Sequence, residues 1–388
     1  MPKNIHRLLP LCIATAFMLL LTHCGQSNPS AGTVGTTTAT RIGHVFVIVL
    51  ENEDYGNTFA ANTAAPYLAK TLPAQGALLQ NYYGTGHLSN DNYISMTSGQ
   101  GPNVLNQTDC ILYSDFIGTG PQLLVNGQAI GQGCVFPTSV ENVANQLDTA
   151  QLSWKGYMED MGNTPGREAA TCGHPALNAQ DGTQTATAKD QYATRHNPFM
   201  YFHSIIDNQA ECDKHVVNLA ALDADLQSVA STPSYSFITP SLCHDGHDSP
   251  CANGEPGGLA SINVFLSEWV PKIMNSPAFR QDGLLIITFD ESNGPQTDAS
   301  ACCGEGPTLN TPLPGVTGLG GGRIGAVLLS PFIKPGTVST VPYNHYSMLR
   351  SVEDIFGLPY LGFAGASGQA SFGSDVFTAQ MPEFPARP

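Results

Sequence analysis

Four short apolar runs, rich in Val, Ile, Leu and Phe, predict the strands of a sheet. The runs from His44 to Leu50 and from Leu284 to Phe289 are almost unbroken by polar residues. Such runs are typical of strands that are buried on both faces of a parallel sheet. Two further runs, Ile324 to Ser330 and Tyr235 to Thr239, each stop at a proline. We expect Lys155-Gly156-Tyr157 to lie at a strand edge.

Between these runs the apolar residues follow a helical spacing. Helices are predicted over residues 66–75, 140–150, 262–274 and 346–356. Strands that alternate with helices predict an α/β fold with a mainly parallel central sheet. No linker-like stretch or internal repeat interrupts residues 42–377. We therefore expect a single domain over 42–388, with its longest loops at 99–138 and 161–195.

The first 41 residues are interpreted as an export signal followed by a flexible linker. Lys3 and Arg7 precede an apolar run from Leu8 to Leu21, which has the length of a signal-peptide core and falls short of the roughly 20 residues of a membrane span. We assign residues 1–24 to a signal peptide. Leu21-Thr22-His23-Cys24 is similar to a bacterial lipoprotein cleavage box, so lipidation of Cys24 and membrane attachment are weighed against ordinary secretion. Residues 25–41 are polar and predict a flexible linker.

Eight cysteines remain after residue 24, which supports export independently. An even number of cysteines predicts up to four disulfides in an oxidising compartment. Pairs Cys110–Cys134 and Cys243–Cys251 are plausible local closures, while Cys302 and Cys303 either bridge each other or pair elsewhere. No cysteine spacing is typical of a zinc site. We expect a protein exported by a bacterium to the periplasm, the outer membrane or the medium.

Composition narrows the range of partners. The chain has 388 residues and a formal charge of −16, since 15 Lys and Arg face 31 Asp and Glu. A protein that binds nucleic acid or anionic lipid through a basic face needs many more cations, so no nucleic acid partner is expected. A phosphorylated substrate must instead meet metal ions or a local cluster of donors. With 41% hydrophobic and 12% charged residues, the chain is expected to be globular.

Acidic residues follow the two most apolar runs. Glu51 and Asn52 come directly after the first run, and Asp290 and Glu291 come directly after the other. Charged residues at strand ends have an ordinary explanation, because strand ends meet solvent. If the two strands are neighbours, however, these side chains converge, and their carboxylates repel one another unless a cation neutralises them. The pattern favours a divalent metal and does not distinguish Mg, Mn, Ca and Zn.

A Gly-containing polar segment from Gly84 to Tyr93 predicts a loop that opens onto a helix. Ser89 in this segment could sit at the amino end of the helix, where free backbone N–H groups favour a phosphate. The alternative is that Ser89 is an ordinary helix cap. The chain contains no G-x-S-x-G, H-E-x-x-H or Walker A motif.

Six ordered segments together resemble the phosphoesterase family of secreted acid phosphatases and bacterial phospholipases C. The resemblance extends from Ile42 to about Gly357 and implies a three-layer α/β/α sandwich of the alkaline-phosphatase-like superfamily. The segments are Glu51-Asn52, His87-x-Ser89-x-x-Asn92-Tyr93, Lys155-x-Tyr157-Met158-Glu159-Asp160, His196-Asn197-Pro198-Phe199, Asp290-Glu291 and Tyr343-Asn344-His345-Tyr346-Ser347-Met348-Leu349-Arg350.

The resemblance also implies roles for individual residues. Ser89 would be the nucleophile, with catalytic support from His345 and His247. The metal would be held by the residues at the strand ends, namely Glu51, Asn52, Asp290 and Glu291. Residues that would contact the substrate phosphate are His87, Asn92, His196 and Asp248. The family commonly has Pro where this chain has Asp91, and a Pro where it has Leu88.

Two polar segments have both a functional and a structural interpretation. His247 and Asp248 belong to a stretch with two His and two Asp in five residues, which is either a phosphate or second-metal site or a solvated turn pinned by cysteines. Arg195 and His196 are either a pair of phosphate donors or a helix end.

These observations favour an exported, metal-dependent hydrolase that acts on a small phosphorylated substrate, more on monoesters than on phospholipids, through a phosphoserine at Ser89. The runner-up is a phospholipase C, which would need an apolar rim for acyl chains, and the sequence shows no obvious exposed apolar loop. A hypothesis of another class is a lipid-anchored binding protein that has lost the reaction. A sulfatase is disfavoured because no C-x-P-x-R segment is present.

Overall fold

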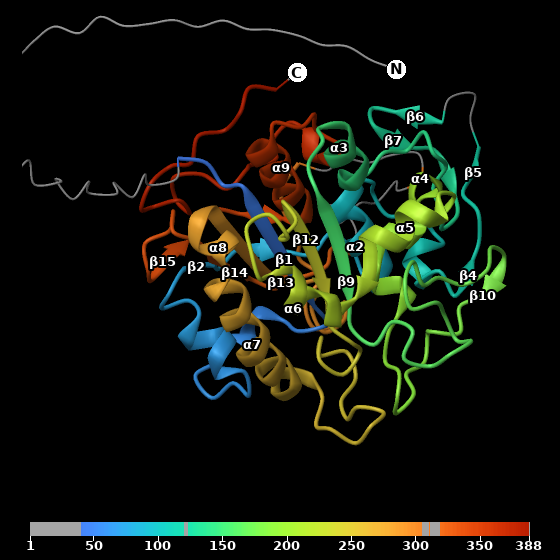
Figure 1. Ribbon diagram of the computed structural model, residues 1–388, viewed down its shortest axis with the longest axis horizontal. Helices are drawn as coiled ribbons and strands as arrows, with labels where there is room; N and C mark the ends of the chain where they lie inside the picture. Colours follow the sequence, from blue (N-terminus) through green and yellow to red (C-terminus); the bar gives the residue numbers. More distant parts are fainter. Residues whose placement is uncertain (1–39, 120–122, 305–309, 311–318, 388) are drawn as a thin grey trace, which may run out of the picture. The chain divides into compact units, whose positions relative to one another are not determined.

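The computed structural model describes residues 40–119, 123–304, 310 and 319–387 (Figure 1). The signal peptide and the lipidation of Cys24 lie outside the described residues, as does nearly all of the linker. Within the described part of the chain, no helix combines the length and the apolar composition that a membrane crossing requires.

An eight-stranded sheet forms the centre of the domain. Its first five strands are parallel, β14 runs antiparallel to both of its neighbours, and β2 and β15 are again parallel to each other. The strands in spatial order are β11 (Val216–Asn218), β9 (Trp154–Met158), β12 (Tyr235–Thr239), β1 (His44–Leu50), β13 (Gly283–Phe289), β14 (Ala326–Leu329), β2 (Ala77–Leu79) and β15 (Thr337–Ser339). The prediction of a mainly parallel sheet is confirmed. Because β9 lies between β12 and β11, the expected edge position of Lys155–Tyr157 is wrong.

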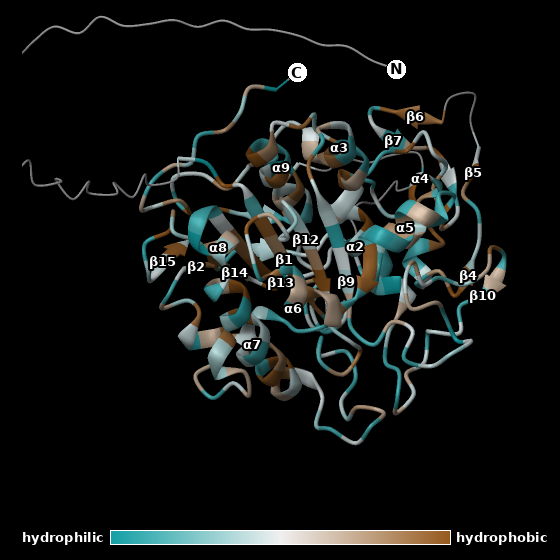
Figure 2. Ribbon diagram, viewed as in Figure 1, coloured by the Kyte–Doolittle hydropathy of each residue, from teal (hydrophilic) through white to brown (hydrophobic). Residues whose placement is uncertain are grey.

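The central strands are buried along their whole length because helices cover both faces of the sheet. Every residue of β1, β12 and β13 is buried, and the sheet contains much of the brown, hydrophobic colour in the centre of Figure 2. Neighbouring residues of β1 point to opposite faces. Phe46 packs on Phe279 of α8 (Pro277–Asp282), whereas Val47 is in register with Phe237, which packs on Tyr93 of α2 (Ser89–Ser98). The result is a three-layer α/β/α sandwich, as predicted.

The helices divide between these two faces. The helix α9 (His345–Phe356) packs beside α2, and α3 (Val143–Thr149) also contacts α2. On the other face, α7 (Gly258–Asn275) contacts both α8 and the π-helix η1 (Tyr67–Thr71). The remaining helices are short: α1 (Tyr55–Thr58), α4 (His203–Ile206), α5 (Gln209–His215) and α6 (Leu222–Asp225).

Three of the four predicted helices are confirmed, and one is much shorter than expected. The helix expected over 66–75 is reduced to the five residues of η1. Pro73 explains the early end, since proline lacks an N–H group and cannot continue the hydrogen bonds of the helix.

The long loops carry small strands of their own. Between Gly99 and Thr138 lie β4 (Leu112–Tyr113), β5 (Ile117–Gly118), β6 (Leu124–Val125), β7 (Gln128–Ala129) and β8 (Gly131–Gln132). Strand β10 (Ala179–Gln180) from the second loop pairs with β4, and β3 (Tyr82–Tyr83) pairs with β16 (Tyr343–Asn344). The 3-10 turns are η2 (Asn106–Thr108), η3 (Thr194–His196), η4 (Pro198–Tyr201), η5 (Leu219–Ala221) and η6 (Gly362–Gly365).

Four disulfides crosslink the domain, in agreement with the predicted number. Both expected local closures are present, and Cys302 bridges Cys303. The remaining bridge joins Cys172 to Cys212. All four lie outside the central sheet, in the loops and at α5, so they brace the long connections rather than the core.

Candidate active site

Three neighbouring parallel strands deliver carboxylates to one edge of the sheet. Glu51 follows β1, Asp290 follows β13, and Asp245 lies six positions after the end of β12. The Glu51 N–H group donates to the Asp245 carbonyl oxygen, and the Asp290 N–H group donates to the Leu50 carbonyl oxygen, each at 2.8 Å. All three carboxylate residues are fully buried. Ligands of open α/β sheets bind at this carboxyl edge.

Ser89 faces this group of carboxylates. It is the first residue of α2, and its Oγ donates a hydrogen bond to Glu51 Oε2 at 2.8 Å. Leu88, which precedes it, is the residue at the N-cap. Ser89 is therefore not the cap of its helix, and its hydroxyl is directed at the site instead.

The loop before Ser89 is held by the side chain of Asn92. Its Oδ1 accepts hydrogen bonds from Thr85 N, Thr85 Oγ1 and Gly86 N, and its Nδ2 donates to the carbonyl oxygens of Gly86 and Leu88. Asn92 was predicted to contact the phosphate. In the structure its amide is occupied by the loop, so it fixes the position of Ser89.

The other predicted metal residues join the same site. Asn52 lies in the left-handed region at φ 56°, which Asn tolerates better than most residues. Its backbone N–H donates to Asp290 Oδ1 at 3.2 Å, and its Nδ2 lies 3.5 Å from Glu51 Oε2. Glu291 donates its backbone N–H to Asp290 Oδ1, and its Oε2 contacts His87 Nδ1. All four predicted ligands are thus within one cluster.

The donors in this cluster fit a hard divalent cation. Asp290 Oδ2 is buried and has no hydrogen-bond partner among the described residues, while the buried Glu51 Oε1 lies in an ion-pair contact with a histidine ring. Burial, followed by the charges of Asp290 and Asp245, raises the pKa of Glu51, and burial also raises the pKa of Asp290. Buried carboxylates that repel one another have the chemistry of an oxygen-rich metal site.

His196 bridges two of the carboxylates. Its Nε2 lies 3.3 Å from Glu51 Oε1, and its Nδ1 lies 3.1 Å from Asp245 Oδ2. The ring stacks on Tyr93 with a centroid distance of 5.2 Å. Ligand atoms of Glu51, His196 and Asp245 all lie within 4.8 Å of one another, so these three residues could also hold an ion. Burial lowers the pKa of His196, which keeps the ring neutral and able to bind a metal.

Arg195 places a cation beside this cluster. Its Nη2 lies 3.1 Å from His247 Nε2, and its Nε lies 3.9 Å from Asp109 Oδ2. The Asp109 carboxylate also accepts the N–H of Asn90 at the start of α2. His247 Nδ1 contacts Asp248 Oδ1 at 2.8 Å. The predicted residues Arg195, His247 and Asp248 therefore form one chain of contacts beside α2.

His345 contacts the backbone of the carboxylate cluster. It is fully buried, its Nε2 lies 2.6 Å from the carbonyl oxygen of Asp290, and its Nδ1 lies 3.3 Å from the Tyr82 hydroxyl. Burial lowers the pKa of His345 to about 4. The ring is thus neutral and supports the backbone that carries Asp290.

Three acidic residues of the site were not predicted. Asp245 could have been found, because it follows the third of the neighbouring strands. Asp109 arrives from the long loop after Gly99, and only the adjacent Cys110 hints at its fixed position. Asp91 is fully buried and its Oδ2 has no hydrogen-bond partner among the described residues. Burial raises the pKa of both Asp91 and Asp109.

Comparison with curated proteins identifies several phosphatases as relatives. An acid phosphatase of Aspergillus fumigatus is 26% identical over 82% of this chain, and the chain spans 55% of that protein's length. A phosphate-repressible acid phosphatase of Penicillium chrysogenum is 26% identical over 81% of the chain and 59% of its own length. A phosphatidylinositol-3-phosphatase of Mycobacterium tuberculosis is 24% identical over 93% of the chain and 92% of its own length.

Two solved structures align with this chain over most of its length at low sequence identity. A protein of the alkaline phosphatase superfamily from Vibrio parahaemolyticus is 11% identical, with a TM-score of 0.46 over 84% of this chain and 69% of its own. A sulfatase from Pseudoalteromonas is 13% identical, with a TM-score of 0.44 over 89% of this chain and 73% of its own.

The model of the Phosphoesterase family matches residues 58–359, which include most of the described domain and the greater part of the site. The chain belongs to the phosphoesterase family.

Proposed function

We propose that this protein is an exported, metal-dependent hydrolase of phosphoric monoesters that works through a phosphoserine at Ser89. The observation that carries the proposal is the hydrogen bond from Ser89 to Glu51, at the amino end of α2 and at the sheet edge where three carboxylates meet. The phosphatase names of the relatives support the same class of reaction. Four disulfides support export, because such bridges persist in oxidising compartments.

The residues of the site supply the protein's part of this reaction. A divalent cation held by Glu51, Asn52, Asp290 and Glu291 would lower the pKa of a nearby hydroxyl and polarise a phosphate oxygen. Glu51 Oε2 already accepts a hydrogen bond from the Ser89 hydroxyl, which places the Ser89 oxygen at the carboxylate cluster. The Arg195 guanidinium would bind the phosphate oxygens.

Hydrolysis of the ester proceeds in two steps. The Ser89 oxygen forms a bond to phosphorus, the bond between phosphorus and the alcohol oxygen breaks, and the alcohol leaves with one proton. Water then attacks the phosphoserine, releases inorganic phosphate and restores the Ser89 hydroxyl. Solvent supplies the proton that the alcohol takes, and it reaches the site past His247, which is partly exposed and accepts a hydrogen bond from Arg195 Nη2 at 3.1 Å.

A phospholipase C is the second candidate, and a surface feature favours it. The sequence suggested no exposed apolar loop, but the loop after Gly99 exposes several large apolar side chains. They are Val104, Ile111, Leu112, Ile117, Leu124 and Val125, with exposed fractions between 39% and 70%. Leu88, directly before Ser89, is 40% exposed, and Cys110, directly before Ile111, contacts Asn90 of α2. Acyl chains could therefore rest close to the site.

Hydrolysis of an aryl phosphate by the wild-type protein and the Ser89→Ala variant tests the proposal. We expect about a 10³-fold or larger loss of turnover in the variant, with unchanged circular dichroism. The matched control is Ser98→Ala, since Ser98 lies in the same helix and donates to the Ile94 carbonyl oxygen instead. Retained turnover in Ser89→Ala would remove Ser89 from its role.

Metal and substrate class are tested in the same assay. Chelator should abolish phosphate release, and added divalent cation should restore it. Faster release of phosphocholine from phosphatidylcholine than of phosphate from the aryl ester would favour the phospholipase C. Bound metal without turnover of any phosphoester would favour the binding protein.

A further inference from the structure

A cavity of about 580 Å³ opens beside the catalytic cluster and is continuous with it through Asn52 and His247. Neither residue is fully buried. The Asn52 amide lies at the metal cluster, and the His247 ring lies beside Arg195. A phosphate bound at Ser89 therefore has this cavity next to it, and the alcohol part of an ester has room there.

Polar side chains and the exposed backbone of glycines form much of the wall of the cavity. Among the described residues its lining contains no Lys, Arg, Phe, Tyr or Trp, and its largest apolar side chain is Leu259. Hydrogen-bonding groups come from Asn52, Glu53, His247, Ser249 and Asn293. Such a lining neither attracts a second anionic group nor offers a surface for an acyl chain.

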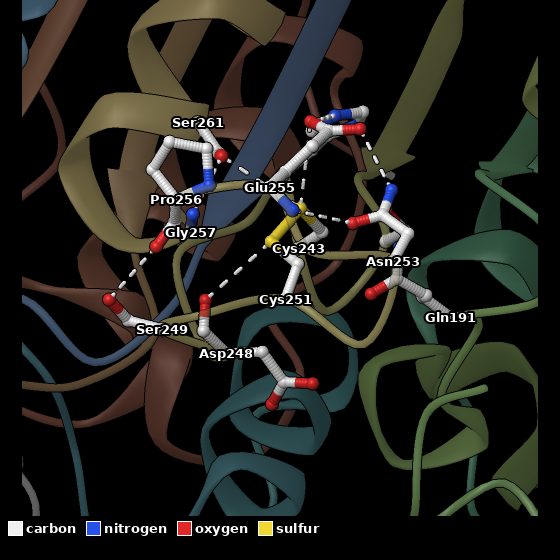
Figure 3. Close-up of a disulfide and its surroundings, with 12 residues drawn as sticks. Gln191, Cys243, Asp248, Ser249, Cys251, Asn253, Glu255, Pro256, Gly257 and Ser261 are labelled. Atoms are coloured by element: carbon white, nitrogen blue, oxygen red, sulfur yellow. Dashed lines mark hydrogen bonds and ion pairs between the residues drawn. A yellow bond between two sulfur atoms is a disulfide. The ribbon is translucent and has the colours of Figure 1, made fainter. Parts of the chain in front are cut away.

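Glycines expose the backbone along one side of the cavity. Gly257 and Gly258 both have positive φ, at 70° and 54°, a region that L side chains rarely adopt. A Cβ on Gly257 would lie 1.8 Å from the Asp248 carbonyl oxygen, so no side chain fits there. The bridge Cys243–Cys251 lies behind this segment, with Ser249 bonded to the Pro256 carbonyl oxygen (Figure 3). The disulfide and this hydrogen bond therefore hold the glycine side of the cavity in place.

The amino end of α7 also faces the cavity. This helix is 18 residues long, and its N-cap, Gly257, has no side chain to bond the first amides. The N–H groups of the first helical turn have no acceptor within the helix. Leu259 and Ala260 of this turn line the cavity, so their backbone donors add to the side-chain acceptors Glu53 and Asn293 opposite.

A second cavity of about 340 Å³ continues from the first. It shares Glu53, Ala64, Leu259 and Asn293 with the first cavity. Its other lining residues add two more amides and a hydroxyl, from Asn57, Asn62 and Thr63. Amide and carboxylate groups can bond two neighbouring hydroxyls at once, because each presents two polar atoms in one plane.

We propose that this pair of cavities, here named the leaving-group site, binds a neutral alcohol with many hydroxyl groups, such as a sugar or another polyol. The inference rests on the proposed phosphomonoesterase function and specifies its substrate class. The volume exceeds that of one sugar ring, so the site has room for a glycoside of more than one ring. A cavity of this size, with polar groups at fixed places, is typical of small-molecule sites.

Two esters of primary alcohols test the substrate class. Glucose 6-phosphate and n-hexyl phosphate have similar leaving groups in chemical reactivity and differ in hydroxyl content. We expect the wild-type kcat/KM for glucose 6-phosphate to exceed that for n-hexyl phosphate by at least tenfold. Equal values, or a preference for the hexyl ester, would overturn the inference while leaving the phosphatase function in place.

Blocking the cavity should remove the preference. Ala64→Trp places a large ring at an exposed position of the wall shared by both cavities, and Asn293→Leu removes an exposed amide there. We expect either change to lower the ratio of the two kcat/KM values at least tenfold. The matched control is Ala61→Trp, at an exposed position outside both cavities, which should leave the ratio unchanged. An unchanged ratio in both cavity variants contradicts the proposal.

A binding measurement separates this inference from the proposed reaction. Saturation-transfer NMR should detect methyl α-glucoside bound to the wild-type protein, in the millimolar range, and lose the signal in Ala64→Trp. This result would stand even if no ester were hydrolysed, in which case the phosphatase function alone would fail. Absence of binding, together with hydrolysis that shows no preference, would refute the leaving-group site alone.

Discussion

Ser89 Oγ and Glu51 Oε2 lie 2.8 Å apart, although 38 positions of sequence separate the two residues. The contact joins the end of β1 to the beginning of α2. It directs the hydroxyl at the carboxylate cluster. The reacting group and its hydrogen-bond acceptor are thus positioned by the two elements themselves.

Replacing Glu51 by Gln should abolish activity and stabilise the metal-free protein. The amide keeps the size of the side chain and removes a buried charge that Asp290 and Asp245 repel. We expect the metal-free variant to melt at a higher temperature than the metal-free wild type. We also expect added cation to stabilise the wild type by about 2.7 kcal/mol at a concentration 100 times the Kd, and the variant by far less. Calorimetry with and without chelator measures both effects.

Glu383→Gln is the control for this experiment, because Glu383 is exposed and far along the chain, in an ion pair with Arg41. It should change neither the melting temperature nor the metal response. A Glu51→Gln protein that retains the full stabilisation by metal would contradict the assignment of Glu51 as a ligand.

Replacing Asn92 by Ala should disorder the loop that carries Ser89. The change leaves buried N–H groups of Thr85 and Gly86 without their acceptor. We expect a loss of about 2–4 kcal/mol in the free energy of unfolding, measured in urea, since several buried hydrogen bonds fail at once. The kcat should fall together with the stability. Asn275→Ala, at an exposed position that accepts a bond from Arg280, should cost much less.

His244 should make stability depend on pH in the alkaline range. Burial lowers its pKa, but hydrogen bonds to Glu159 and Glu255 outweigh burial and raise the pKa to about 9. A raised folded-state pKa stabilises fully below the unfolded value near 6.5, and this contribution is lost as the pH rises through 9. We expect His244→Gln to cost about 1–2 kcal/mol at pH 6, allowing for partial solvent screening, and almost nothing at pH 10. Urea unfolding at both pH values measures this, and a difference independent of pH would refute it.

The sequence predicted the strands well because their residues are buried on both faces. Strands β1 and β12 have the predicted bounds, and β13 begins one residue earlier than expected. The convergence of Glu51 and Asp290 depended on the two strands being neighbours, and the register of β1 with β13 confirms that they are. The direction of β14 could not be predicted, since an apolar run does not encode whether a strand is parallel or antiparallel to the next.

The remainder of the site depends on contacts that no local pattern records. Asp245 lies on the segment that follows a predicted strand, but only its backbone contact with Glu51 in three dimensions distinguishes it from His247 and Asp248 in the same segment. Asp109 reaches α2 from a long loop. The exposed apolar side chains of that loop were missed as well, since exposure depends on packing and not on the type of residue.

The bridge between Cys110 and Cys134 fixes the residue next to Asp109, whose carboxylate in turn holds the first amides of α2 and faces Arg195. This covalent closure forms only where thiols are oxidised. A newly made chain that still carries free sulfhydryls lacks this covalent support for Asp109. The placement of Asp109 between α2 and Arg195 is therefore coupled to the redox conditions that the polypeptide meets as it matures.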